Sequence, residues 1–139
     1  IEKDFCSFGH KFADRCGHAD KNYHSQERSP IFIQALDCVY QILLQHPQAF
    51  EFQANLLDYL VGHAYSCKYG TFLFNSERER DAAKVRQFTS SVWTVVAKKK
   101  EFLNPNYIPK QGLLSITVDP RHVQLWPFYY RWDLTQKRA

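Results

Sequence analysis

Two apolar segments with helical spacing set the strongest limits on what this chain can fold into. The first covers residues 30–45, where Ser29 is placed as an N-cap and Pro30 as the first helical residue. His46 followed by Pro47 is expected to end this helix, because the residue before a proline avoids helical geometry. Its apolar residues form two stripes, Phe32, Leu36, Val39 and Leu43 on one and Ile31, Ala35, Cys38 and Ile42 on the other. A helix with two such stripes is expected to be buried around much of its circumference.

The second segment predicts a helix over residues 53–69. Its inward positions are Leu56, Leu57, Leu60, Val61, Ala64 and Tyr65. Gly70 is the expected C-cap, because glycine readily adopts the left-handed conformation that ends many helices. Together the two helices indicate a mainly α fold, and a content of 45% hydrophobic residues is enough to build a core.

A further helix is predicted at the N-terminal end. Its apolar face consists of residues at spacings i, i+4, i+7 and i+11, namely Ile1, Phe5, Phe8 and Phe12. Gly9 weakens this helix, and Gly17 is expected to end it. Residues 20–28 are polar and lack periodicity, which predicts an exposed loop.

Shorter elements are predicted after residue 75. Ser76 and Glu79 form a capping-box pattern in front of a charged helix that is expected to lie at the surface. Residues 89–91 are expected to cap a short helix that contains Val92, Trp93, Val95 and Val96. The lysines at 98–100 would then lie at its C-terminal end, where positive charge suits the helix dipole.

The remaining stretch predicts a loop at residues 104–109 and one short strand at residues 113–118. No repeat or linker divides the sequence, so residues 1–139 are interpreted as a single unit without an internal boundary.

The composition favours a segment of a larger cytosolic protein. The chain has no Met and opens on Ile-Glu-Lys-Asp-Phe, which resembles the middle of a helix. The net charge of +4 fits either contact with an anionic ligand or an ordinary soluble domain. The four cysteines are expected to be reduced, because no secretory signal points to an oxidising compartment. Cys38 and Cys67 lie within apolar helical patterns and are expected to pack as small hydrophobes.

One group of residues has the chemistry of a zinc site. Cysteine and histidine are zinc ligands, and the candidates are Cys6, His10, Cys16, His18 and His24. Their spacing does not match the usual paired loops and overlaps an apolar helical face. The interpretation we prefer is a buried cysteine, a capping histidine and solvent-facing loop residues, with no metal and no cofactor.

A second group is basic. Lys11, Arg15 and His18 have helical spacing, so a helix would present them together, and Asp14 could neutralise Arg15. Two cations on one face can hold phosphate, and arginine can do so with two hydrogen bonds. On these residues alone, a solvated basic patch is the commoner interpretation.

The sequence contains no nucleophilic motif. A cysteine phosphatase needs an arginine six residues after its cysteine, but the residues at that spacing are Phe12, Asn22, Leu44 and Leu73. There is no Gly-x-Ser-x-Gly elbow and no glycine-rich phosphate loop. The chain by itself therefore predicts no catalytic residue.

An aromatic run with one arginine, residues 126–132, could stack on bases or meet a membrane interface. Packing into the core, or onto the rest of a larger domain, is the interpretation we prefer, and no nucleic-acid partner is expected.

Several strings, in order, resemble the myotubularin family. They are Ser7-Phe8-Gly9-His10-Lys11-Phe12-Ala13-Asp14-Arg15-Cys16-Gly17-His18, then Arg28-Ser29-Pro30-Ile31-Phe32 with Leu36-Asp37-Cys38-Val39, then Ala49-Phe50-Glu51-Phe52, Tyr65-Ser66-Cys67 and Tyr69-Gly70-Thr71-Phe72-Leu73-Phe74-Asn75, and finally Ser91-Val92-Trp93, Asn104-Pro105, Arg121-His122 and Tyr130-Arg131-Trp132. The resemblance covers nearly the whole chain. It implies the helical C-terminal segment of an α/β cysteine-phosphatase domain, downstream of the nucleophile loop.

The resemblance also implies a function. Myotubularins remove the 3-phosphate from phosphatidylinositol 3-phosphate and phosphatidylinositol 3,5-bisphosphate. Lys11 and Arg15 stand where the family has basic side chains that line the inositol phosphate pocket. Arginine often stands at the position of Lys11, so recognition of the 5-phosphate is expected to differ here.

Further implications concern partners and location. The resemblance implies a phosphoinositide head group as ligand, peripheral contact with endosomal membranes from the cytoplasmic side, and homo- or hetero-oligomers with related family members. The alternative function is that of a catalytically dead relative that serves as a scaffold for protein–protein interaction.

Overall fold

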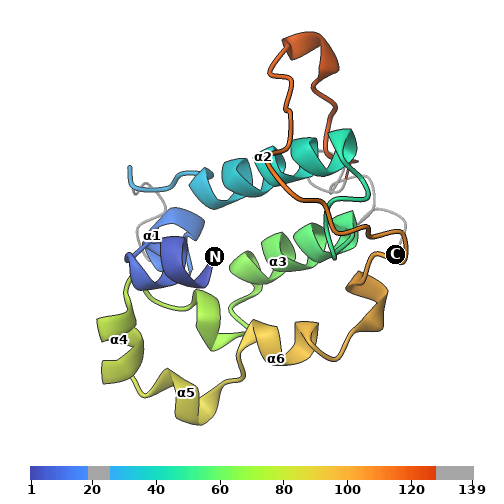
Figure 1. The fold of residues 1–139 in the computed structure, drawn as a ribbon. Coiled ribbons are helices and arrows are strands. Elements are labelled where there is room, and N and C mark those ends of the chain that lie inside the picture. Colours follow the sequence, from blue (N-terminus) through green and yellow to red (C-terminus); the bar gives the residue numbers. More distant parts are fainter. Residues whose placement is uncertain (19–25, 128–139) are drawn as a thin grey trace, which may run out of the picture.

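The computed structural model describes residues 1–18 and 26–127 (Figure 1). Its two longest helices, α2 (Ile31–Gln45) and α3 (Ala54–Ser66), lie side by side and run in opposite directions. The shorter α1 (Phe12–Cys16) packs against α3, and α4 (Glu77–Ala82), α5 (Val85–Phe88) and α6 (Val92–Val96) follow along the other side of the molecule. Four single-turn elements complete the order: the π-helical turn η1 (Glu2–Ser7) and the 3₁₀ turns η2 (Gly70–Phe72), η3 (Lys100–Phe102) and η4 (Pro120–His122).

The prediction of a mainly α fold is confirmed. Within the described ranges the structure has no strand, and one isolated bridge joins Phe52 to Leu103. The strand predicted over residues 113–118 is not formed within the described residues, where this stretch pairs with no other strand. No helix of the described part is long and apolar enough to cross a bilayer.

The N-terminal helix predicted from Ile1 to Gly17 is divided in two. Gly9 takes a φ of +80° between η1 and α1, and this turns the chain so that Phe8 is 75% exposed while Phe12 is fully buried. The predicted end of the helix is confirmed, since Gly17 is the left-handed C-cap of α1. A single helix is ruled out because the left-handed glycine interrupts it.

The predicted ends of the long helices need two corrections. Pro30, not Ser29, is the N-cap of α2, and no side chain caps this end. Cys67, with a φ of 55°, is the C-cap of α3, and Gly70 instead begins η2. A side chain at Gly70 would meet Val85 and Thr89, so close packing rather than capping requires glycine here.

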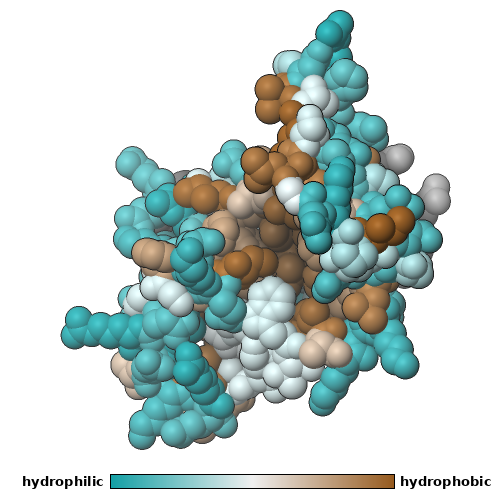
Figure 2. Space-filling model, in the orientation of Figure 1, coloured by the Kyte–Doolittle hydropathy of each residue, from teal (hydrophilic) through white to brown (hydrophobic). Residues whose placement is uncertain are grey.

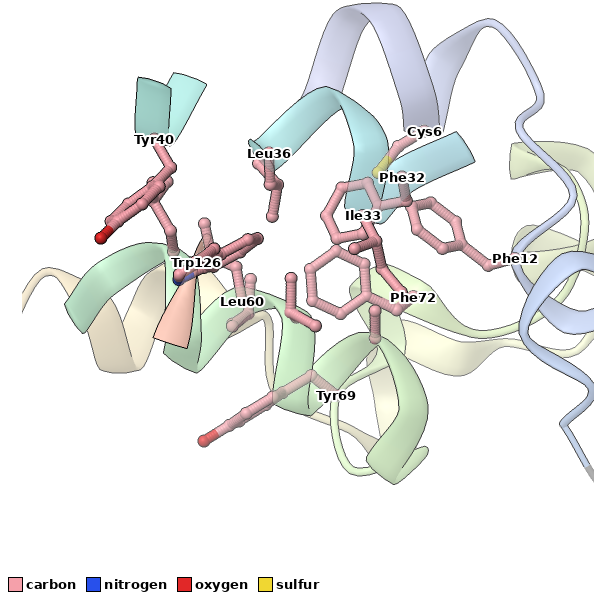
Figure 3. Close-up of a cluster of buried hydrophobic side chains, with 14 residues drawn as sticks. Cys6, Phe12, Phe32, Ile33, Leu36, Tyr40, Leu60, Tyr69, Phe72 and Trp126 are labelled. Carbon is pink, nitrogen blue, oxygen red and sulfur yellow. The ribbon is translucent and has the colours of Figure 1, made fainter. Parts of the chain in front are cut away.

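The core lies between α1, α2, α3 and η2, as Figure 3 shows. The rings of Phe12, Phe32 and Phe72 contact one another at centroid distances of 5.1 to 5.6 Å. At the other end of α2, Trp126 stacks on Tyr40 with ring centroids 5.6 Å apart. Trp126 is 1% exposed, which confirms core packing for this residue, while residues 128–132 of the aromatic run lie outside the described ranges.

The predicted burial of α2 and α3 is correct on one face only. The inner face of α2 is formed by Phe32, Ile33, Leu36 and Tyr40. Ile31 and Cys38, from the second predicted stripe, are exposed, as are Tyr65 and Cys67 at the end of α3. Cys38 and Cys67 therefore do not pack as small hydrophobes, because one points away from the core and the other caps a helix in solvent. All four cysteines are free thiols.

The caps of the later helices are confirmed. The hydroxyl of Ser76 accepts a hydrogen bond from the backbone N–H of Glu79 at 3.2 Å, and Ser91 accepts one from that of Trp93. The carboxylate of Glu79 accepts from the N–H of Asn75, one residue earlier than a standard capping box. The charged segment after Ser76 lies largely at the surface, as predicted, and a left-handed Lys84 divides it into α4 and α5.

Candidate anion-binding site

The basic pair, Lys11 and Arg15, lies at the two ends of a single helical turn. Lys11 is the N-cap of α1 and therefore precedes the helix, whereas Arg15 lies within it. The backbone N–H of Arg15 donates to the carbonyl of Lys11 at 2.8 Å, which fixes the spacing between the two residues. The prediction that these cations lie close together agrees with the structure, although one helix does not carry both.

Glu27 joins the two cations from across the following loop. The Lys11 ammonium lies 3.1 Å from one carboxylate oxygen of Glu27 and 3.3 Å from the other. The Arg15 guanidinium donates to the backbone carbonyl of Glu27 at 3.0 Å. Both side chains thus contact Glu27, Lys11 through its carboxylate and Arg15 through its backbone carbonyl.

The two other members of the predicted basic face are placed differently. Asp14 lies 4.0 Å from the ammonium of Lys11, so the partner expected for Arg15 is instead close to Lys11. The ring of His18 turns away from the basic pair, and its Nε2 lies 2.5 Å from the carbonyl oxygen of Ala64. Within the described part of the chain, the structure brings Lys11 and Arg15 together and leaves His18 out.

Sequence reasoning missed Glu27 as a member of this group. It lies in the stretch predicted to be an exposed polar loop, and an isolated glutamate in such a loop carries no motif. Its contact with Lys11 spans 16 positions, so no helical periodicity connects the two residues.

His10 borders the basic pair from the inside. Its ring packs edge-on against Phe5 and Phe12, with centroid distances of 5.1 and 4.6 Å. Burial, together with the nearby positive charge of Arg15, lowers the pKa of His10 below its ordinary value of 6.5. Its Nε2 is buried and has no hydrogen-bond partner among the described residues. The pKa of His10 therefore depends on the charge of Arg15.

The residues considered for zinc do not form a metal site in the described ranges, where no group of three or more possible ligands converges. Cys6 donates to the carbonyl of Thr71, and His24 lies outside the described residues. Burial raises the pKa of the Cys6 thiol and of the Cys16 thiol to about 11. Protonated thiols are poor zinc ligands and poor nucleophiles, so neither cysteine is set up for either role.

Residues 1–81 match the family described as the myotubularin-like phosphatase domain. The chain belongs to this family. The resemblance found in the sequence motifs is thereby confirmed, and the helical fold is that of a segment of such a domain.

Known relatives extend the match to the rest of the chain. Myotubularin of Xenopus tropicalis is 45% identical over 136 residues, which are 96% of this chain and 23% of that protein. The phosphatidylinositol-3,5-bisphosphate 3-phosphatase mtm-1 of Caenorhabditis elegans is 46% identical over 134 residues, 94% of this chain and 23% of the relative. The phosphatidylinositol-3,5-bisphosphate 3-phosphatase MTMR2 of Gallus gallus is 41% identical over 140 residues, 99% and 24% respectively. The chain therefore spans just under a quarter of the length of these curated relatives.

Proposed function

We propose that this myotubularin segment forms one wall of the substrate pocket of a phosphoinositide 3-phosphatase, whose substrates are phosphatidylinositol 3-phosphate and phosphatidylinositol 3,5-bisphosphate. The observation that carries the proposal is the convergence of Lys11 and Arg15 on Glu27. Lys11 holds the carboxylate of Glu27, and a phosphate presents similar charged oxygens, so the same ammonium suits a phosphate. Arg15 donates to the neighbouring carbonyl oxygen, and the same guanidinium can donate to a phosphate oxygen.

The two cations have different roles in this proposal. Arg15 offers a planar set of N–H donors that can hold two phosphate oxygens, and Lys11 offers a point charge. Neither residue breaks a bond. The nucleophile is a thiolate outside these 139 residues, since no cysteine here begins a Cys-x5-Arg loop. That thiolate would form the phosphocysteine intermediate.

The names of the relatives support an enzyme rather than a scaffold. The relatives from Caenorhabditis elegans and Gallus gallus are both named as phosphatidylinositol-3,5-bisphosphate 3-phosphatases. At 46% and 41% identity they support the same reaction class for the protein to which this segment belongs.

The proposal includes a location and partners. A lipid substrate supports peripheral contact with the cytoplasmic side of endosomal membranes, and the family resemblance supports assembly with itself or with related members. A fluorescent fusion that stays diffuse would contradict the endosomal location. A full-length protein that sediments as a monomer at all concentrations would contradict the assembly.

The direct experiment is the substitution Arg15→Ala in the full-length phosphatase. Loss of one charge-assisted contact with phosphate is expected to lower kcat/KM by roughly 10- to 150-fold, the equivalent of about 1.5–3 kcal/mol. The matched control is Arg78→Ala, because Arg78 is an exposed arginine on α4. Wild-type turnover by Arg15→Ala would remove Arg15 from the site.

A further inference from the structure

Residues 109–125 form an arm that rises from the body of the molecule beside α2 (Figure 1). Two glutamines one turn apart on α2 hold it. The side-chain amide of Gln45 donates to the carbonyl of Thr117 at 3.1 Å and accepts from the N–H of Thr117 at 2.9 Å. The amide of Gln41 makes the same pair of hydrogen bonds with the backbone of Gln124, at 2.7 and 3.1 Å.

The first leg of the arm is residues 113–118. Its two edges differ, because only one of them faces α2. The backbone groups of Thr117 point toward Gln45, and the carbonyl of Ser115 points toward His46, whose Nε2 lies 2.7 Å away. Ser115 and Thr117 are two residues apart and face the same side, which is the geometry of an extended chain. In such a chain, alternate residues direct their backbone N–H and C=O groups to opposite edges.

The second edge is open. It carries the backbone groups of Leu114, Ile116 and Val118, none of which has a hydrogen-bond partner among the described residues. One side of this leg is thus paired by the side chains of a helix, while the other presents a row of unused donors and acceptors. Such a row is the usual template for adding a β-strand.

The side chains fit the same interpretation. Leu113 is 99% exposed and Val118 is 88% exposed, and Figure 2 shows apolar residues along the arm. The stretch between Lys110 and Asp119 carries no charge and is rich in β-branched residues, which favours pairing in a sheet.

The lengths of the relatives support a partner from the same polypeptide. The match with the myotubularin of Xenopus tropicalis covers 96% of this chain, so it extends through the arm. The matched stretch is 23% of that protein, so most of the relative's polypeptide lies outside it. We infer that residues 113–118 form an edge strand whose open edge pairs with a β-strand from the remainder of the full-length phosphatase.

This inference rests on the family membership and not on the roles of Lys11 and Arg15. An arm that pairs as described in a protein with normal Arg15→Ala turnover would leave the inference standing and remove the proposed pocket. An unpaired arm in a protein whose turnover falls in Arg15→Ala would remove the inference and leave the proposed pocket standing. The two proposals can therefore fail independently.

The experiment is residue-resolved amide hydrogen exchange on the full-length protein. The amides of Leu114, Ile116 and Val118 are expected to exchange at least about 100-fold more slowly than that of Ser115, because a strand ladder protects alternate positions. Fast exchange at all three amides would overturn the inference. Protection that increases with protein concentration, together with the mass of a dimer, would also overturn it and assign the edge to a second copy.

Two proline variants provide a matched pair. Ile116→Pro removes an N–H from the open edge, whereas Ser115→Pro removes an N–H that faces α2 and has no partner among the described residues. The expected result is a loss of protection at Leu114 and Val118 in Ile116→Pro, and protection retained in Ser115→Pro. Equal effects of the two substitutions would overturn the assignment of the paired edge.

Discussion

The guanidinium of Arg80 donates a 2.9 Å hydrogen bond to the carbonyl of Cys6, which connects α4 to the N-terminal turn across 74 positions of sequence. The same side chain donates to the carbonyl of Leu73 at 2.8 Å and pairs with Glu77 at 3.2 Å. Arg80 is 4% exposed, which is unusual for an arginine. These contacts allow a charged residue to lie in the interior, since each of the three guanidinium nitrogens donates a hydrogen bond.

Replacement of Arg80 by alanine is therefore expected to destabilise the fold by about 1–3 kcal/mol, because it removes the side-chain donor to the carbonyl of Leu73 and leaves the carbonyl of Cys6 with the backbone N–H of Gly9 alone. Urea unfolding followed by circular dichroism measures the change. Arg78→Ala, on the exposed face of the same helix, is the control and should stay within about 0.5 kcal/mol of wild type. Similar midpoints for the two variants would show that the buried contacts contribute little.

The burial of Arg80 could not be predicted from the sequence. The strongly periodic helices, the caps at Ser76 and Ser91 and the left-handed Gly17 follow from local patterns, so they could be predicted. The burial of Arg80 depends on Cys6, far away in sequence, and the segment looked like a solvated surface helix. A local pattern cannot show which face of a charged helix a distant turn will cover.

The same distinction applies to the candidate site. Lys11 and Arg15 were found because they are four residues apart and stand in a family motif. Glu27 was not found, because it reaches Lys11 across a loop. Gly70 was assigned as a cap because glycine often ends helices, whereas its actual reason is the packing of Val85 and Thr89, which only the tertiary structure shows.

His10 provides a test of the electrostatics of the basic pair. The pKa of His10 is lowered first by burial and second by the charge of Arg15. Arg15→Gln removes the second cause and keeps the first, so the pKa of His10 is expected to rise partway toward 6.5. A titration of the imidazole signals by NMR measures this change. An unchanged pKa of His10 would mean that the Arg15 charge does not reach it.

The lowered pKa of His10 also makes the stability of the fold depend on pH. The pKa of His10 is lower in the folded state than its ordinary value of 6.5, so its contribution to stability is present above pH 6.5 and is lost as the pH falls through the folded-state pKa. Arg15→Gln should make this loss smaller. Unfolding midpoints measured from pH 7.5 down to about pH 5, for wild type and the variant, should therefore converge at acidic pH if Arg15 otherwise stabilises the fold.

Glu27 competes with any anion for the basic pair. Glu27→Gln removes the carboxylate that lies on Lys11, while the backbone carbonyl that accepts from Arg15 remains. Exposed ion pairs are worth about 0.2–1 kcal/mol, so affinity for a soluble inositol phosphate is expected to increase by roughly 1.4- to fivefold. Isothermal titration calorimetry measures the affinity. Glu101→Gln, which breaks the Lys99 pair elsewhere, is the control, and an equal gain there would point to net charge alone.

Replacement by alanine is expected to have opposite effects on stability at Gly62 and at Gly70. Gly62 lies inside α3, and a side chain there would meet nothing within 4 Å, so Gly62→Ala should stabilise the protein by about 0.5–1 kcal/mol through helix propensity. Gly70 is buried against Val85 and Thr89, and Gly70→Ala would force these branched side chains apart. Overpacking of this kind costs about 1–3 kcal/mol. Thermal melts of the two variants should therefore shift in opposite directions, and a shift to lower Tm in both would show that Gly62 is required for a reason other than helix propensity.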